Sequence, residues 1–249
     1  MARRTPDGPP PPPVVQRLRI RYAKRGRLRF TSHRDFARAF ERALRRAEVP
    51  MAYSGGFSPH PKISYAGAAP TGVASEAEYL EIGLARESDP EQIRAAIDAA
   101  LPDGLDILEI VPASPGGNFA DRLQAAHWHI ELPGVDPDRL HDAVVTLLGK
   151  TELTVQRLTK DGRRDIDVRH ALVSAKVGPS GGRAIMEVVV RQVTPTVRPD
   201  DILAALRIVG DLAPEAPAVS VRVAQGPLDE TGKVSDPLIP DRPPARRTP

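Results

Sequence analysis

Basic side chains are concentrated near the start of the chain, where their types and spacing suit the binding of phosphate. Between residues 17 and 46 the sequence has twelve arginines and lysines against two acidic residues, whereas the formal net charge of the whole chain is only +3. Arginine stays charged at any cellular pH and makes bidentate contacts with phosphate oxygens. Charge concentrated on one element attracts a polyanion more strongly than charge spread over the surface. This segment is therefore the first candidate for a binding site.

Four of the arginines are expected on one side of a helix. Ser32 and Asp35 have the spacing of a capping box, and a proline follows at position 50, so a helix is predicted over residues 33–48. At roughly 100° per residue its apolar residues gather on one side. On the other side lie Arg34, Arg38, Arg42 and Arg45. A row of arginines at this spacing can follow a nucleic-acid backbone. The alternative is a solvated face with pairs such as Glu41 and Arg45, but two acidic residues cannot neutralise so much charge.

The segment 53–62 follows this helix and reads Tyr-Ser-Gly-Gly-Phe-Ser-Pro-His-Pro-Lys. Its glycines let a ligand approach the backbone, its rings offer stacking surfaces, and its histidine and lysine can contact phosphates or base edges. The alternative is a plain Gly/Pro turn with Phe57 packed into the core. The helix, its approach and this loop give the predicted nucleic-acid-binding residues: Arg27, Arg29, Ser32, His33, Arg34, Arg38, Arg42, Arg45, Tyr53, Gly55, Gly56, Phe57, His60 and Lys62.

Two pairs of histidines raise the question of chemistry beyond binding. His33 opens the helix, where an anion is favoured, and His60 lies in the loop, so the two could act as acid and base on a phosphodiester without a metal. We favour the plainer interpretation that both contact the ligand or support the structure. His127 and His129 project to one face of an expected strand, as metal ligands would, but the sequence shows no third ligand nearby. We therefore expect no metal.

A second alternating motif lies in the later part of the chain. Asp165, Asp167 and Arg169 alternate along an expected strand and would share one face of it. Such a face is either a second binding site or a paired, solvated strand surface. We favour the solvated surface.

The composition excludes several classes of chemistry. The chain has no cysteine, so a thiol nucleophile, cysteine-bound zinc, an iron–sulfur cluster and disulfides are all excluded. Phosphate-binding glycine loops, a nucleophile elbow and the HExxH zinc motif do not occur. We expect no cofactor. No run approaches the roughly 18 apolar residues of a membrane span, and the first residues lack the apolar stretch of a signal peptide. We therefore expect a cytoplasmic protein with no membrane partner.

The order of expected elements predicts an α+β protein of two domains. The first, over residues 15–112, has strands at 15–23, 51–53, 63–66, 77–84 and 105–111 and helices at 33–48 and 90–101. The second, over residues 113–225, has a helical stretch at 119–126, strands at 127–132, 153–158, 166–174, 185–190 and 219–223, and helices at 137–148 and 199–209. The first follows the β-α-β-β-α-β order with its middle crossover elaborated, and the second repeats this pattern, so we expect tandem ferredoxin-like domains. Residues 1–14 and 226–249 are polar and Pro-rich, and we expect disordered tails there.

Four motifs resemble the bacterial radical SAM-linked protein family. They are RLRFTSHRD at 27–35, FERALRR at 40–46, GFSPHPKIS at 56–64 and GVASEAEYL at 72–80. The resemblance extends over about residues 15–225, and DIDVR at 165–169 looks like the family's second motif, Asp-x-Arg. His170 stands where the family has proline, and Gly55 stands where glutamine is common.

This resemblance implies a role but no settled reaction. The family is a domain of unknown function that occurs alone or behind a radical SAM domain, which implies substrate recognition or a protein partner. A radical SAM enzyme needs a cysteine-bound cluster, so a chain without cysteine would assist a separate enzyme.

These observations predict an RNA-binding accessory protein without catalysis of its own, which presents tRNA or rRNA to a modifying enzyme. One alternative is a metal-independent endoribonuclease or RNA-modifying enzyme that uses His33 and His60. Another is a docking module for a radical SAM enzyme. The sequence leaves open the identity of the RNA, the protein partner, the oligomeric state and the role of the second domain.

Overall fold

The computed structural model describes residues 11–160, 162–178 and 183–243 of a mixed α/β protein, with five α-helices in this part of the chain. The chain forms two compact units. One contains Met1–Gly72, Ala77–Asn118 and Leu238–Pro249, and the other contains Val73–Glu76 and Phe119–Pro237. The chain therefore enters each unit more than once.

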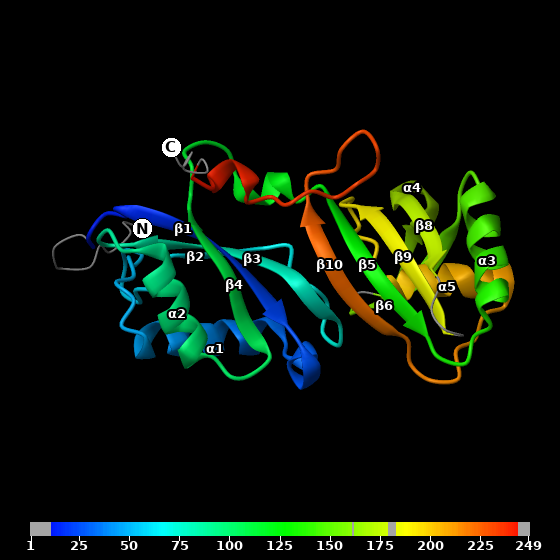
Figure 1. Ribbon diagram of the computed structural model, residues 1–249, viewed down its shortest axis with the longest axis horizontal. Coiled ribbons are helices and arrows are strands. Elements are labelled where there is room, and N and C mark those ends of the chain that lie inside the picture. Colours follow the sequence, from blue (N-terminus) through cyan, green and yellow to red (C-terminus); the bar gives the residue numbers. More distant parts are fainter. Residues whose placement is uncertain (1–10, 161, 179–182, 244–249) are drawn as a thin grey trace, which may run out of the picture. The chain divides into compact units, whose positions relative to one another are not determined.

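The first unit is built from four strands and two helices. Its elements are β1 (Gln16–Lys24), η1 (Gly26–Phe30), α1 (His33–Arg46), β2 (Ile63–Ala66), β3 (Ala74–Leu84), α2 (Pro90–Ala100) and β4 (Leu105–Pro112). The strands lie in the order β4-β1-β3-β2, and the pairs β1–β4 and β2–β3 are antiparallel. Helices α1 and α2 lie along one face of this sheet (Figure 1). The expected Met51–Tyr53 strand is reduced to two single bridges, from Met51 to Leu84 and from Tyr53 to Pro61.

Helix α1 begins where its capping residues predict. The Ser32 hydroxyl accepts a hydrogen bond from the Asp35 amide at 3.1 Å and donates one to the Asp35 carboxylate at 2.6 Å. The helix ends at Arg46, two residues earlier than expected. Glu48 there takes a left-handed conformation with φ of 51°, and the next amide, that of Val49, bonds back to the Leu44 carbonyl.

Aromatic and aliphatic side chains join α1 to the sheet. Phe36 and Phe40 are buried, and the ring of Phe36 stacks on that of Tyr22 from β1 with 4.4 Å between centroids. Leu18 and Ile20 of β1 lie in the same core. Residues three and four positions apart share this buried side of α1, so residues two positions from Phe36 and Phe40, about 200° around the helix, face outward.

The second unit repeats the order of strands with an insertion. Its elements are η2 (Phe119–Arg122), β5 (Ala125–Leu132), α3 (Pro137–Gly149), β6 (Thr154–Thr159), β7 (Gly162–Asp167), α4 (Val168–Ala171), β8 (Leu172–Gly178), β9 (Ala184–Arg191), α5 (Pro199–Gly210) and β10 (Val219–Gly226). The main sheet runs β10-β5-β9-β8 with antiparallel pairs, and β6 pairs only with β7. Ala74 and Ser75 pair in parallel with β10, so this sheet is mixed.

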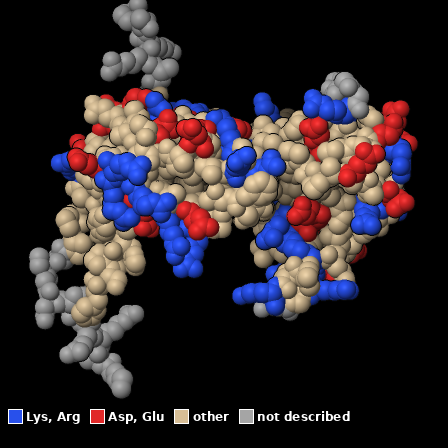
Figure 2. Space-filling view, turned by 90° about the horizontal axis from the view of Figure 1, so that it is seen from below, with Lys and Arg blue, Asp and Glu red and all other residues tan. Residues whose placement is uncertain are grey.

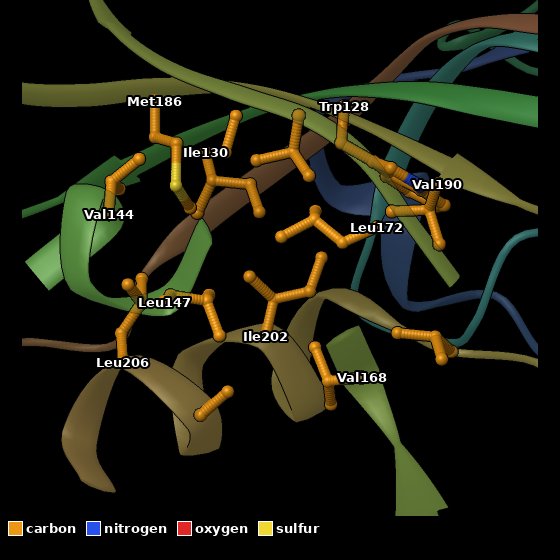
Figure 3. Close-up of a cluster of buried hydrophobic side chains, with 14 of the residues drawn as sticks. Trp128, Ile130, Val144, Leu147, Val168, Leu172, Met186, Val190, Ile202 and Leu206 are labelled. Carbon is orange, nitrogen blue, oxygen red and sulfur yellow. The ribbon is translucent and has the colours of Figure 1, made fainter. Parts of the chain in front are cut away.

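The core of this unit lies between its sheet and its helices. Trp128 and Ile130 of β5 meet Leu147 of α3 and Ile202 and Leu206 of α5 (Figure 3). Of these, Ile130, Leu147, Ile202 and Leu206 are 0% exposed. Apart from Trp128 and Met186, the buried hydrophobic residues of this core are aliphatic.

The single strand expected over residues 166–174 is wrong. Strand β7 ends at Asp167, one turn of helix follows as α4, and β8 begins at Leu172. The Asp167 carboxylate accepts a hydrogen bond from the His170 amide at 3.1 Å, which caps that turn. The alternation of polar and apolar residues continued through this cap, so periodicity alone did not reveal the break.

The expectation of a disordered tail from residue 226 is also wrong for the residues described, which extend to residue 243. Leu238 is 0% exposed, and a short helix, η3 (Ile239–Asp241), follows it. Asp241 is buried against β1, where its carboxylate lies 2.5 Å from the guanidinium of Arg19. The proline content was misleading because distant residues hold this segment: Asp241 pairs with Arg19 and accepts a hydrogen bond from the Ser114 amide at 3.0 Å, and Arg242 pairs with Glu109. Residues 1–10 of the expected N-terminal tail lie outside the described residues.

The ion pair between Asp241 and Arg19 generates the first prediction. Replacing Asp241 with Asn keeps the shape but removes the charge, and Glu81 then remains as a partner of Arg19 at 3.2 Å. We expect a loss of about 2 to 3 kcal/mol of unfolding free energy in urea denaturation, because a buried cation loses the charge of a partner. The control is Glu109→Gln, whose more exposed pair with Arg242 should contribute at most about 1 kcal/mol. Equal losses in the two variants would contradict a structural role for Asp241.

Candidate nucleic-acid interface

The basic segment is divided by its ion pairs. On β1, Arg17 and Arg19 both contact Glu81, at 3.0 and 3.2 Å, and Arg19 also pairs with Asp241. Arg25 pairs with Asp106 of β4 at 2.6 Å. Arg19 is buried, so only part of the basic segment is available at the surface. The charges of these arginines are therefore engaged in ion pairs within the first unit.

The arginines of α1 lie in a different environment. Arg34, Arg38, Arg42 and Arg45 are all exposed, and within the described residues none of them makes an ion pair. Glu41 and Arg45 do not form the pair weighed as an alternative. Figure 2, which looks from the side where α1 lies in Figure 1, shows lysine and arginine side chains gathered over this part of the first unit. The helix thus presents cations that no described carboxylate neutralises.

Two further cations precede α1. Arg27 is exposed and Arg29 is half-buried, and both belong to η1, a short helix that the sequence did not predict. The Arg29 carbonyl accepts a hydrogen bond from the Gly72 amide at 2.8 Å, which anchors η1 to the start of β3. These two residues extend the basic surface beyond the N-terminus of the helix.

The loop 53–62 is closed at its base and open at its tip. The Ser54 amide donates to the His60 carbonyl at 2.8 Å, and the His60 amide donates to the Ser54 hydroxyl at 3.0 Å. Lys62 continues the ladder through its backbone and exposes its side chain. Gly56 has a φ of 114°, a conformation that residues with a side chain rarely adopt. The loop is held in shape by its own backbone.

The rings of this loop are exposed. Phe57 is 72% exposed and Tyr53 is 38% exposed, so the interpretation of Phe57 as a core residue is wrong. Tyr53 and Pro61 line a small hollow together with Glu41 and Arg45 of α1. The structure therefore brings the base of the loop and the second half of the helix together.

One aromatic residue of this surface was missed from the sequence. Phe30, the last residue of η1, is 60% exposed, and the guanidinium of Arg29 lies 4.8 Å from its ring centroid. A phenylalanine beside an apolar strand is usually a core residue. The only available signal was its position between Arg29 and the Ser32 cap, inside a basic segment.

The two histidines of the catalytic alternative have separate surroundings. The ring of His33 packs edge-on against Tyr65 of β2, with 4.8 Å between centroids. The backbone of His60 closes the loop 53–62, and His60 itself is exposed. In the described part of the chain no hydrogen bond joins the two residues. This geometry gives no support to an acid–base pair.

Tyr65 has an unusual hydroxyl beneath α1. The residue is half-buried, and its hydroxyl oxygen has no hydrogen-bond partner among the described residues. Burial, and to a smaller extent the nearby carboxylate of Glu41, raise the pKa of this phenol above its ordinary value. Tyr65 therefore stays protonated and neutral at physiological pH.

His127 and His129 share a carboxylate from the neighbouring strand. Their ring nitrogens lie 2.7 and 2.6 Å from the two oxygens of Glu187 on β9. No group of three or more potential ligands in the described residues is arranged to hold a metal ion. The carboxylate thus lies beside both imidazoles, and its hydrogen bond is with His129.

The motif of Asp165, Asp167 and Arg169 forms hydrogen bonds at the ends of two helices. Arg169 donates to the carbonyls of Leu148 and Lys150 at the end of α3, at 3.3 and 2.9 Å, and Asp167 caps α4. Asp165 is exposed at the end of β7. The three residues do not share one strand face, because the strand ends at Asp167. Two of them serve the local fold.

A family of uncharacterized proteins conserved in bacteria, DUF2344, matches residues 17–199. The chain belongs to this family. No curated protein matches it. The matched residues include η1, α1 and the loop 53–62, together with the strand pair β6–β7 of the second unit.

Solved structures resemble the chain only distantly. A crystal structure of a Cbf5-Nop10-Gar1 complex has 14% identity and a TM-score of 0.46, and the match covers 92% of this chain but 56% of that one. An unknown protein from Galdieria sulphuraria has 17% identity and a TM-score of 0.24, over 82% and 95% of the two chains. The first two RRM domains of yeast poly(U) binding protein (Pub1) have 10% identity and a TM-score of 0.19, over 83% and 98%. None of the helices described is long and apolar enough to cross a membrane.

The closed loop generates a prediction about its rigidity. Ser54→Ala removes the hydroxyl that accepts the His60 amide, and loss of one hydrogen bond of about 1 kcal/mol should speed exchange of that amide roughly fivefold. Hydrogen exchange followed by NMR measures this rate. Ser58→Ala, which changes a serine at the exposed tip of the same loop, is the control and should leave the rate unaltered. An unchanged rate in Ser54→Ala would show that the loop is not held by this bond.

The raised pKa of Tyr65 generates a prediction about alkaline stability. In the unfolded chain a tyrosine ionises near pH 10, whereas in the folded protein Tyr65 keeps its proton to higher pH. The unfolded state therefore loses this proton first, so stability is complete below about pH 10 and falls as the pH rises above it. Tyr65→Phe should reduce that fall, as measured by urea unfolding at pH 8 to 11. An identical decline in wild type and variant would exclude this contribution.

Proposed function

We propose that this protein binds RNA through the exposed arginines of α1 and the loop 53–62, and that it presents tRNA or rRNA to a separate modifying enzyme of the radical SAM type. The observation that carries the proposal is the row of four exposed arginines without ion-pair partners in the described residues. It acts in the cytoplasm and performs no catalysis itself. The proposal includes a protein partner because the motifs of this chain resemble those of the radical SAM-linked family.

The charge supports a polyanion as the ligand. The four arginines, from Arg34 to Arg45, extend over about 17 Å of helix, and each offers a fork of donors to phosphate. Neutralising a phosphate releases condensed counterions, which favours binding at low salt. Lys62 and the η1 arginines add cations at the margins of the helix.

The loop supports nucleic acid in particular. Its exposed rings offer stacking surfaces, and His60 offers hydrogen bonds to base edges. Because the loop adjoins Arg45 through the hollow at its base, phosphates bound along α1 would bring bases close to Tyr53. Arginines would thus position the strand and the loop would contact its bases.

The fold proposed for both units is ferredoxin-like. Each has the β-α-β-β-α-β order with its fourth strand beside the first and its second at the edge, as in β4-β1-β3-β2 and β10-β5-β9-β8. In the second unit, β6, β7 and α4 are an insertion between α3 and β8. In this proposal the sheet of the first unit supports the RNA interface, and the sheet of the second unit supports whatever other functions the protein has.

Replacing Arg38 and Arg42 together with alanine tests the proposal. Binding of purified protein to labelled cellular RNA is measured across a salt series, and the retained RNA is sequenced. We expect steep salt dependence in the wild type, enrichment of tRNA or rRNA, and a slope of log affinity against log salt that is smaller by about 1.4 in the variant. The matched control is Arg191→Ala with Arg207→Ala, which removes the same charge from exposed positions of the second unit.

Each outcome has a distinct meaning. Equal slopes in the two double variants would remove α1 from the interface. Absence of binding at low salt would contradict RNA as the ligand, and co-purification with a protein after nuclease treatment would then favour a docking module. Discrete new RNA ends that disappear in His33→Ala would show an endoribonuclease.

A further inference from the structure

The aromatic residues of this chain are divided unevenly between core and surface. The sequence has ten, and all of them are in the described residues. Seven are buried or half-buried, and the other three, Phe30, Tyr53 and Phe57, are exposed by 60%, 38% and 72%. All three adjoin α1, since Phe30 lies two residues before its cap and the loop of the other two meets its second half. Every exposed phenylalanine and tyrosine of the chain therefore lies in the segment just before the arginine helix or in the loop that follows it.

From this arrangement we infer that Phe30 is a second stacking platform for bases and that the interface is specific for single-stranded RNA. The inference rests on the proposed function and extends it to the class of RNA. Phe30 would hold a base near the N-terminus of α1, and Phe57 with Tyr53 would hold bases near its other half. The arginines between them would contact the phosphates.

The backbone of Phe30 is fixed before any ligand binds. η1 is closed by hydrogen bonds from Leu28 to the Arg25 carbonyl and from Thr31 to the Leu28 carbonyl, both at 3.0 Å. The side chain of Leu28 packs against the core, and Gly72 binds the Arg29 carbonyl. A ring held in this way loses little conformational entropy on stacking.

The ring of Phe30 also lies close to the guanidinium of Arg29. The guanidinium of Arg29 lies 4.8 Å from the centroid of Phe30, and a Cβ placed on Gly72 would lie 3.9 Å from the ring edge. With 60% of the residue exposed, ring surface remains open to a ligand. A base stacked there would meet an aromatic ring and a nearby positive charge, the combination used by proteins that bind single strands.

The geometry favours single-stranded over duplex RNA. In an A-form helix the bases stack on one another, and only their edges and the backbone are accessible to a protein. Side chains that offer ring faces gain nothing from such a ligand. Unpaired bases in a loop or at an end can turn outward and stack.

The same arrangement favours RNA over a protein partner. The centre of a protein–protein interface is depleted of charge, with aromatic anchors in the middle and polar residues at the rim. Here the order is reversed, because Arg34, Arg38 and Arg42 occupy the middle and the rings lie at the ends. A strand with phosphates along its length and bases beside them matches that order.

The test compares a 12-nucleotide single-stranded RNA with a duplex of the same sequence, using wild type, Phe30→Leu and Phe30→Tyr. Leucine keeps the apolar bulk and removes the stacking face, whereas tyrosine restores it. We expect the wild type to prefer the single strand at least tenfold, Phe30→Leu to weaken single-strand binding by about 5- to 150-fold, and Phe30→Tyr to bind like the wild type. The salt slope should stay the same in all three, since no cation is lost.

Ile208→Ala is the matched control, because Ile208 is 62% exposed in the second unit and should leave affinity unchanged. Equal binding of single strand and duplex, or equal affinity of wild type and Phe30→Leu, overturns the inference while the proposed function stands. Failure of the wild type to bind either RNA overturns both. Binding to a protein partner that Phe30→Leu weakens, without RNA binding, assigns the surface to that partner and likewise overturns the inference.

Discussion

The first unit depends on compensating the charge of Arg19 inside the protein. Side chains alternate along a strand, so β1 can give Leu18 and Ile20 to the core only if Arg19 points to the opposite face of the sheet. There its side chain is 3% exposed, and an unpaired guanidinium at such a site would be strongly destabilising. Glu81 provides one carboxylate and Asp241 the other. The segment that returns to this unit therefore supplies part of the charge compensation of Arg19.

The same constraint separates cations that hold the fold from cations that are available to a ligand. Both kinds come from one basic segment, and a count of charges treats them as equivalent. On β1 the neighbouring strand supplies carboxylates, so Arg17 and Arg19 are paired. On α1 the apolar side faces the sheet, and Arg38 and Arg42 are exposed and make no ion pair with the described residues. Whether an arginine is available to a ligand thus depends on whether its strand or helix places it beside a carboxylate.

Features encoded by neighbouring residues could be predicted, whereas those set by distant residues could not. Strand β2 was expected at 63–66 and is found there, and α1 begins at His33 as its cap predicted. Asp241 meets Arg19 across 222 residues of sequence, and no local pattern announces that contact. The break at Asp167 escaped notice for a different reason, because a side-chain cap interrupts a strand without changing the alternation of residues.

The candidate site shows the same division at the level of single side chains. The outward direction of Arg38 follows from helical period, so it could be deduced from the sequence. Phe30 ends a short 3-10 helix and Phe57 lies in a loop, and for both the backbone around them decides whether the ring is buried. Hydrogen bonds at Arg29 and Ser54 hold both segments in conformations that leave the rings outside. Exposure at these two positions is thus a property of short, stiff backbone segments, and it places rigid aromatic surfaces beside a helix whose cations are unpaired.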